Sequence, residues 1–290
     1  MKTQKTNTKN LTKKLTESSL MVAFATVLSM LKLIEMPYGG SVTLASMLPI
    51  LIVSYRFGVG TGLMSGVVYA VIQQLLGLNN LSYVTGWQSV LAVIFLDYVL
   101  AFTVIGLGGI FKNKLKVFEE NHPKRQAAEL ATGMAFVCIL RYICHTVAGA
   151  TVWAGLSIPT EAALIYSISY NATYMLPETI VSVLVAFWMG TVIDFSQNVP
   201  TRFLSSAIGA IKGASYEIMM HFATLISLFT VALDTLFIAP HLQDAESGEF
   251  TLSYLTDVNW ILITVFTLIG IAASVILIVI AKRGQKRPKD

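Results

Sequence analysis

The chain has 290 residues, of which 55% are hydrophobic and 12% are charged, with a formal net charge of +4. Soluble domains contain about 25% charged residues, so this composition excludes a soluble globular protein and indicates an integral membrane protein. Its long apolar runs also exclude a transmembrane β-barrel, whose strands give short alternating segments. The two cysteines, Cys138 and Cys144, lie in one apolar segment and predict neither a disulfide framework nor a metal site. We expect no cofactor and no nucleic-acid partner.

Eight apolar segments predict an all-α membrane protein with eight spans, preceded by a basic arm over residues 1–19. The second segment is short and contains Pro49, whereas the sixth is longer than the roughly 20 residues that a span requires. The expected spans are 20–34, 42–55, 59–76, 87–111, 127–154, 163–193, 218–239 and 258–281.

The distribution of lysine and arginine predicts the orientation of these spans, because cytoplasmic loops collect basic residues. If both termini are cytoplasmic, eighteen of the 20 basic residues fall on the cytoplasmic side. The exceptions are Lys32, whose amine can reach the outer surface, and Arg141, which lies inside the fifth span. We therefore expect a multi-pass protein of the cell membrane with its N- and C-termini inside.

The connection at 194–217 predicts a division of the chain into two parts. We expect residues 1–195 to form a six-span unit that includes the basic arm and carries nearly all of the unusual residues. Residues 196–290 are expected to supply a connecting segment, a two-helix hairpin and a basic tail. The hairpin contains few polar residues, so we expect it to be a peripheral addition.

Residues 141–178 carry an unusual density of polar and aromatic side chains for a membrane region. Arg141, His145, Gly149 and Trp153 follow one another at intervals of four, which places them on one face of a helix. Ionisable groups at membrane depth are costly and usually serve a function. This helix face therefore predicts a functional site.

Polar groups from three spans are expected at a similar depth. At 1.5 Å per residue, Asp97 and His145 both lie about 15 Å from the outer ends of their spans, and Asn171 lies somewhat closer to the surface. Arg141 and Glu178 fall nearer the midplane, where opposite charges are expected to pair. These positions predict a chamber that opens outward and has a charged pair as its floor.

The residue types around this chamber favour a flat heteroaromatic cation as the ligand. A negative charge comes from Asp97, and hydrogen-bonding groups come from His145 and Asn171. Each well-placed ring can contribute about 0.5 to 2 kcal/mol through stacking and cation–π contact. The alternative for aromatic residues near span ends is an interfacial belt, and for Arg141 and Glu178 a purely structural pair. The candidate rings are Trp87, Tyr98, Trp153, Tyr166, Tyr170 and Tyr174.

Four segments within residues 15–195 are similar to one known family. They read PYGGSVTLASMLPILIVSYRFGVGTGLMSG, FLDYVLAFTVIGLGGIF, RYICHTVAGATVWAG and YSISYNATY. In these segments the chain resembles the thiamin-specific S-components, the substrate-binding subunits of energy-coupling factor (ECF) transporters. The resemblance implies a six-helix protein that captures thiamin outside the cell. It also implies docking on a transmembrane coupling subunit that is driven by two ATP-binding subunits.

The resemblance also implies which residues bind the ligand, and it shows two departures from the family pattern. Asp97 stands where the family usually has glutamate, which shortens the side chain by one methylene. Gly39 and Gly40 stand where some members place a tryptophan over the ligand. The implied binding residues are Asp97, Tyr98, His145, Trp153, Tyr166 and Asn171.

Small residues spaced four apart on the first span provide a candidate docking face. In the family this pattern contacts the coupling subunit, and here it falls on Ser19 and Ala23, with Ala25 and Ser29 as a further pair. Small side chains let helix backbones approach closely in a membrane. The chain contains no GxxxxGK[ST] phosphate loop, so energy must come from a partner or an ion gradient.

Two alternatives belong to other functional classes. The first is an ion-coupled secondary transporter for an organic cation or another vitamin, with Arg141, Glu178 and Asp97 as a proton relay. The second is an intramembrane enzyme that uses His145, which we disfavour because the sequence has no metal-ligand spacing and no nucleophile elbow. We therefore expect a transport protein and no enzymatic activity.

Overall fold

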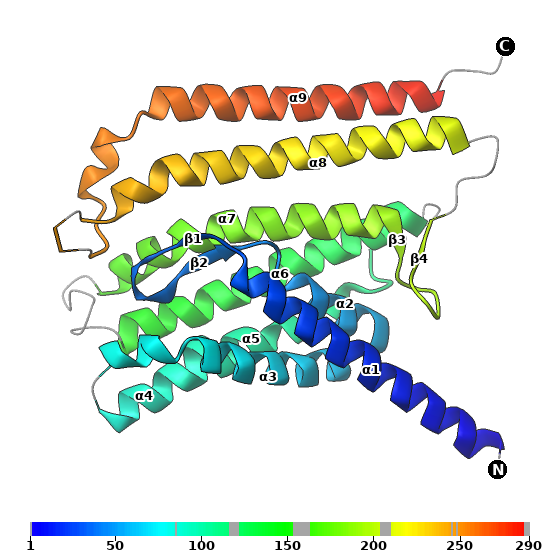
Figure 1. Cartoon of the computed structure of the whole chain (residues 1–290), viewed down its shortest axis with the longest axis horizontal. Coiled ribbons are helices and arrows are strands. Elements are labelled where there is room, and N and C mark those ends of the chain that lie inside the picture. Colours follow the sequence, from blue (N-terminus) through cyan, green and yellow to red (C-terminus); the bar gives the residue numbers. More distant parts are fainter. Residues whose placement is uncertain are drawn as a thin grey trace.

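The computed structural model describes residues 2–84, 86–115, 122–152, 163–203, 210–244, 246–247 and 249–286. Long helices run roughly along one direction, and both termini lie at the same end of the molecule (Figure 1). The long helices are α1 (Lys2–Met30), α2 (Leu48–Phe57), α3 (Val59–Leu76), α6 (His122–Thr151), α7 (Ala163–Val192), α8 (Ala210–Ile238) and α9 (Trp260–Lys286).

Residues 87–111 form one continuous helical rod made of four pieces. The rod begins as α4 (Trp87–Val93), changes to π-helical geometry in η3 (Ile94–Leu100), and continues through α5 (Ala101–Thr103) into η4 (Val104–Phe111). A π-helical turn is rare and is often found at functional positions. Here it contains Asp97 and Tyr98.

Within the described residues, six helices are long and apolar enough to cross a membrane. They confirm a multi-pass, all-α protein, but they do not confirm the prediction of eight spans. Helix α2 has 10 residues, which gives a length of about 15 Å, roughly half of the hydrocarbon core. The expected span at 42–55 is therefore wrong as a full crossing. The six helices cover Val59–Leu76, Trp87–Phe111, His122–Thr151, Ala163–Val192, Ile218–Leu242 and Trp260–Arg283.

A β-hairpin follows α1 at the end of the bundle that lies opposite the termini. Its strands β1 (Lys32–Glu35) and β2 (Ser41–Thr43) pair antiparallel, and the turn between them places Tyr38 and Gly39 at φ values of 65° and 98°. The first expected span, 20–34, consequently ends earlier than predicted, at Met30. The hairpin lies across α6 and α7 in the view of Figure 1.

Glycines allow η4 to approach α3 and α6 closely. A Cβ added to Gly106 in η4 would lie 2.3 Å from the backbone nitrogen of Leu63 in α3. A Cβ added to Gly133 in α6 would lie 2.4 Å from the carbonyl oxygen of Gly108. Such backbone contacts are typical of helix packing in membranes. They fix the rod that carries Asp97 against its two neighbours.

The end of the bundle near the termini is held together by buried polar contacts. The Gln126 side chain is 1% exposed, donates to the carbonyl oxygens of Gly190 (3.0 Å) and Ile193 (2.6 Å), and accepts from the Phe195 N–H (3.0 Å). These bonds attach α6 to the end of α7 and to the short hairpin β3 (Ile193–Asp194) and β4 (Thr201–Arg202).

Helices α8 and α9 form an antiparallel pair beside α7 (Figure 1). Small and hydroxylated residues lie between them, because Ser227 and Ser274 are hydrogen-bonded at 3.0 Å and Thr267 donates to Asp234 at 2.7 Å. Hydroxyl bonds of this kind join helices in membranes. The connection between the two helices contains η7 (Ala239–Leu242) and η8 (Ser253–Asp257) and reaches the same end of the bundle as the β1–β2 hairpin.

Candidate ligand-binding site

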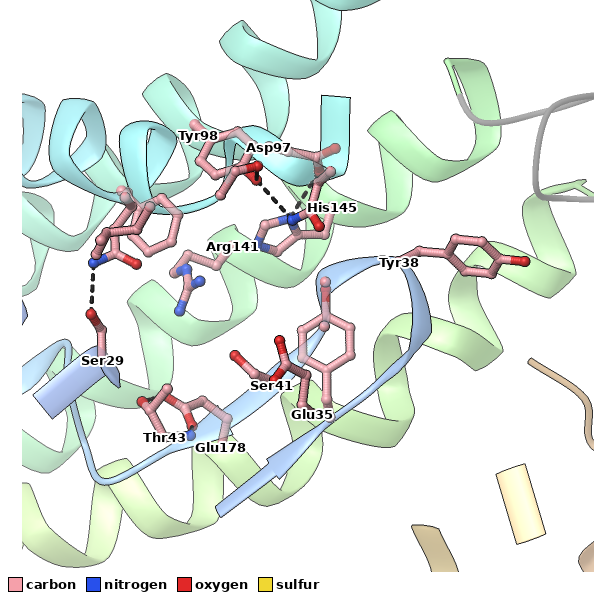
Figure 2. Close-up of a pocket in the computed structure, with 18 of the residues that line it drawn as sticks. Ser29, Glu35, Tyr38, Ser41, Thr43, Asp97, Tyr98, Arg141, His145 and Glu178 are labelled. Atoms are coloured by element: carbon pink, nitrogen blue, oxygen red, sulfur yellow. Dashed lines mark hydrogen bonds and ion pairs between the residues drawn. The ribbon is translucent and has the colours of Figure 1, made fainter. Parts of the chain in front are cut away.

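A cavity of about 480 Å³ lies inside the first six-helix part of the chain. Side chains from the β1–β2 hairpin, α3, η2 (Leu78–Tyr83), η3, α6 and α7 surround it (Figure 2). This volume is within the range of sites for small organic ligands. Its wall contains eight of the ten residues for which we predict substrate contact or a place in the floor: Asp97, Tyr98, Arg141, His145, Gly149, Tyr166, Asn171 and Glu178.

Asp97 and His145 contact each other at the cavity wall. Asp97 Oδ1 lies 2.9 Å from His145 Nδ1, and the two side chains are 15% and 12% exposed. The second ring nitrogen of His145, Nε2, is buried and has no hydrogen-bond partner within the described part of the chain. A carboxylate and an imidazole thus lie together at the cavity wall (Figure 2).

Asn171 is held in one orientation by its own helix. Its Nδ2 donates to the Ser167 carbonyl oxygen at 2.8 Å and approaches the Ser167 hydroxyl at 3.2 Å. Its Oδ1 accepts from the Tyr174 hydroxyl at 2.6 Å. These spacings of three and four residues bring the groups together on one face of α7. The Tyr174 ring also meets the His145 ring edge-on, with centroids 6.3 Å apart.

Tyr98 stands at the opposite wall and is held through its hydroxyl group. That hydroxyl donates to the Gly77 carbonyl oxygen at 3.3 Å and accepts from Asn80 Nδ2 at 3.1 Å. A Cβ at Gly77 would lie 2.3 Å from the same hydroxyl oxygen. The absence of a side chain at Gly77 therefore leaves space for the tyrosine.

The prediction that Arg141 and Glu178 form an ion pair is wrong. Both side chains are buried and line the cavity, but no ion pair joins them in the described part of the chain. Glu178 instead accepts from the backbone N–H of Thr43 at 2.5 Å and from its hydroxyl at 2.8 Å. The Arg141 guanidinium lies 4.5 Å from the centroid of the Phe102 ring and contacts the sulfur of Met47.

Of the predicted aromatic residues, Trp87 is not in the cavity wall and Trp153 cannot be compared. Trp87 begins α4 and is 71% exposed, which fits the alternative of an interfacial residue. Trp153 lies outside the described residues. The structure brings other groups to the wall that sequence reasoning missed, and most of them are polar residues without a recognisable motif: Ser29, Tyr38, Thr43, Ser46, Tyr69, Gln73 and Asn80.

The predicted docking residues lie on an exposed face of α1. Ser19 and Ala23 are exposed, whereas Ala25 and Ser29 are 0% and 7% exposed and face the bundle. The two small-residue pairs therefore differ in role. Only the first pair is accessible to a partner.

The described residues contain no group of three or more His, Cys, Asp or Glu side chains that could hold a metal ion. The polar groups of the cavity wall include carboxylates, an imidazole, amides and hydroxyls. Aromatic rings from η3 and α7 alternate with the carboxylate, imidazole and amide groups.

Comparison with known proteins identifies the family. Residues 15–198 match the model of the family described as thiamine transporter protein (Thia_YuaJ). The thiamine transporter ThiT of Bacillus subtilis (strain 168) is 32% identical over 175 residues, which cover 59% of this chain and 87% of that relative. The protein of the same name from Lacticaseibacillus paracasei is 23% identical over 177 residues, which cover 58% of this chain and 82% of the relative.

A solved structure supports the fold of the same region. The structure of ThiT from Listeria monocytogenes superposes with a TM-score of 0.51 at 23% sequence identity, covering 63% of this chain and 94% of that one. The chain thus shares the fold of that protein over 63% of its length, and helices α8 and α9 lie beyond the residues that the family model matches. On the match over residues 15–198, the chain belongs to the thiamine transporter protein family.

Proposed function

We propose that this protein is a membrane-embedded binding subunit that captures thiamin from outside the cell and delivers it through an ATP-driven ECF complex. Family membership supports a role in thiamin uptake. The observation that carries the ligand assignment is the Asp97–His145 contact at 2.9 Å in a cavity lined by the rings of Tyr98, Tyr166 and Tyr174.

This combination suits the chemistry of thiamin. The vitamin joins two flat heteroaromatic rings, one of which carries a fixed positive charge. Ring faces and a carboxylate both attract such a cation, and the imidazole and amide groups can bind the polar edge of the other ring. We assign ligand contact to Asp97, Tyr98, His145, Tyr166, Asn171 and Gly149, and a contact from Trp153 remains part of the proposal.

A binding assay tests this proposal directly. The purified full-length protein is titrated with thiamin by isothermal titration calorimetry, with Asp97→Ala and Asn171→Ala as site variants and Trp87→Ala as a matched control outside the cavity. We expect saturable binding at one site, weakened in the two site variants and unchanged in the control. The absence of saturable binding to the wild type would exclude the ligand assignment. Competition with thiamin phosphates and with the pyrimidine half identifies which form the site prefers.

The delivery step requires partners, and the exposed face of α1 is our candidate for their docking. Ser19 and Ala23 are exposed there beside Leu20 and Phe24, which are 66% and 55% exposed. Small residues flanked by apolar ones allow a second helix to approach closely. We expect Ala23→Trp to abolish thiamin uptake and co-purification with co-expressed ECF coupling and ATP-binding subunits, while thiamin binding is retained. Leu225→Trp, on the exposed face of α8, is the matched control.

Vesicles that contain this chain alone separate the proposal from an ion-coupled transporter. We expect no thiamin accumulation in response to a pH gradient, because the proposed energy source is ATP hydrolysis by the partners. Gradient-driven accumulation by the chain alone would contradict ECF delivery and favour ion coupling. It would leave the thiamin assignment intact.

A further inference from the structure

Phe250, in the connection between α8 and α9, packs against two tyrosines of the cavity wall. Its ring meets the Tyr166 ring at 5.3 Å and the Tyr170 ring at 5.1 Å, both nearly perpendicular. Its carbonyl oxygen accepts a hydrogen bond of 2.9 Å from the Tyr166 hydroxyl. Phe250 is 4% exposed and lies 52 positions beyond the end of the family match at residue 198. A segment outside the family region thus contacts the candidate site.

The connection holds Phe250 in place through a small β-like turn. Gln243 and Phe250 form an antiparallel β-bridge. Next to it, the Thr251 N–H donates a hydrogen bond to the Leu242 carbonyl oxygen at 3.1 Å. At the tip, the Asp244 carboxylate accepts from the N–H of Ser247 at 2.8 Å and from the Tyr254 hydroxyl at 2.9 Å. The position of the Phe250 ring is therefore defined by its own segment before it meets the tyrosines.

The two tyrosines connect Phe250 to the cavity and to the β1–β2 hairpin. Tyr166 and Tyr170 both line the cavity. The Tyr170 hydroxyl donates to the Pro37 carbonyl oxygen and accepts from the Gly40 N–H at 3.2 Å. Tyr170 is thus held on one side by the hairpin and on the other by Phe250. Tyr166 is held by Phe250 through both its ring and its hydroxyl group.

We propose that Phe250 is a positioning residue for ligand binding, which holds Tyr166 and Tyr170 as a fixed aromatic wall and thereby slows the release of thiamin. This inference rests on the proposed function, because it concerns the same cavity and the same ligand. Rings that are already ordered lose less freedom when a ligand stacks on them. The C-terminal hairpin consequently belongs to the binding site, in contrast to the peripheral role expected from the sequence.

The dissociation rate of thiamin is the quantity that this role controls, since interface changes act mainly on dissociation. In full-length protein, we expect Phe250→Ala to release thiamin about tenfold faster, because two ring contacts are lost, with an unchanged association rate. Phe266→Ala is the matched control, since Phe266 stacks on Phe237 within the same hairpin and lies outside the cavity wall. We expect this control to leave both rates unchanged.

A double-mutant cycle separates positioning from general stabilisation of the fold. If Phe250 acts in part through Tyr166, then Phe250→Ala has a smaller effect on thiamin release in a Tyr166→Ala background than in the wild type, because only the contact with Tyr170 remains to be lost. Additive effects, an unchanged release rate in Phe250→Ala, or equal effects in Phe266→Ala would each overturn the inference.

A more conservative substitution tests the inference if the Phe250→Ala variant does not fold. Phe250→Leu retains most of the volume but loses the ring, so we expect release about threefold faster with an unchanged unfolding temperature. A wild-type release rate in Phe250→Leu would overturn the inference. Failure of the wild type to bind thiamin would exclude the proposed function and this inference together, whereas wild-type binding with unaffected Phe250 variants would exclude the inference alone.

Discussion

The Asp97 carboxylate and the His145 imidazole meet at 2.9 Å, although they come from different helices and lie 48 residues apart in the chain. The contact fixes the orientation of the imidazole at the cavity wall, and Nε2 is buried without a partner among the described residues. One pair therefore places a carboxylate and an oriented imidazole at the same point of the cavity wall.

The Asp97–His145 pair is expected to act as a unit in binding. Asp97→Asn preserves the shape of the side chain but removes the charge that attracts a cation, so we expect thiamin affinity to fall at least about tenfold. His145→Ala is expected to have a similar effect. Because the residues contact each other, the double variant should lose less than the product of the single losses. Titration calorimetry of the three variants measures this coupling, and strictly multiplicative losses would contradict it.

Gly40 is expected to tolerate no side chain without loss of binding. A Cβ there would lie 2.6 Å from Cδ1 of Tyr174 and 3.0 Å from the Tyr170 hydroxyl oxygen. Gly40→Ala must displace these rings, so we expect roughly tenfold weaker thiamin binding. The control is Gly60→Ala in α3, where no atom lies within 4 Å of the added Cβ. Equal affinities of the two variants would show that the rings adjust without consequence for the ligand.

Gln126 is expected to stabilise the end of the bundle near the termini without affecting the ligand. Gln126→Ala leaves two backbone carbonyl groups and one N–H without their partner. We expect a loss of about 2 kcal/mol in unfolding free energy, because unsatisfied buried groups are costly. Thermal unfolding in detergent measures the effect, with the exposed Gln197→Ala as the control. An unfolding temperature equal to that of the control would contradict this role.

Asp244 is expected to act on ligand release through the turn that carries Phe250. The Ser247 N–H, the Tyr254 hydroxyl and the Glu246 N–H lower the pKa of the Asp244 carboxyl to about 2. Because this pKa lies below its ordinary value of 3.8, the ionised group stabilises the turn at all higher pH values. That contribution is lost only as the pH falls from about 4 to about 2.

The Asp244→Ala variant should therefore release thiamin faster than the wild type by a constant factor between pH 5 and pH 8. We expect a smaller effect than for Phe250→Ala, since the ring contacts persist. Rapid-mixing measurements of release at several pH values check this. A factor that changes across this pH range would show that a different group is responsible.

The apolar runs predicted the later spans correctly because length and hydropathy determine them directly. Helices at 59–76 and 87–111 begin and end as expected, and α7 differs from its prediction by one residue. The first two spans differ because hydropathy does not reveal backbone pairing. The strands β1 and β2 interrupt an otherwise apolar region and leave α2 too short to cross.

Counting depth along the helices placed Asp97 and His145 at the same level of the membrane. It could not predict in which direction each side chain points or which group it contacts. The π-helical geometry of η3 turns less per residue than an α-helix, so a 3.6-residue wheel does not predict where Trp87 points relative to Asp97. Depth also predicted Arg141 as the partner of Glu178. The actual partner, Thr43, belongs to a strand that enters the bundle at that level, and no helical pattern indicates it.

The contact between Tyr166 and Phe250 can form only late in synthesis, because Phe250 follows Tyr166 by 84 residues. Domains generally fold N-terminal first as they leave the ribosome. The helices that enclose the cavity are complete by residue 192, but the ring that supports its tyrosines follows only at residue 250. A nascent chain therefore passes through a stage in which the six-helix part is inserted while its aromatic wall is unsupported. Insertion of α8 and α9 is then the step that brings Phe250 to Tyr166.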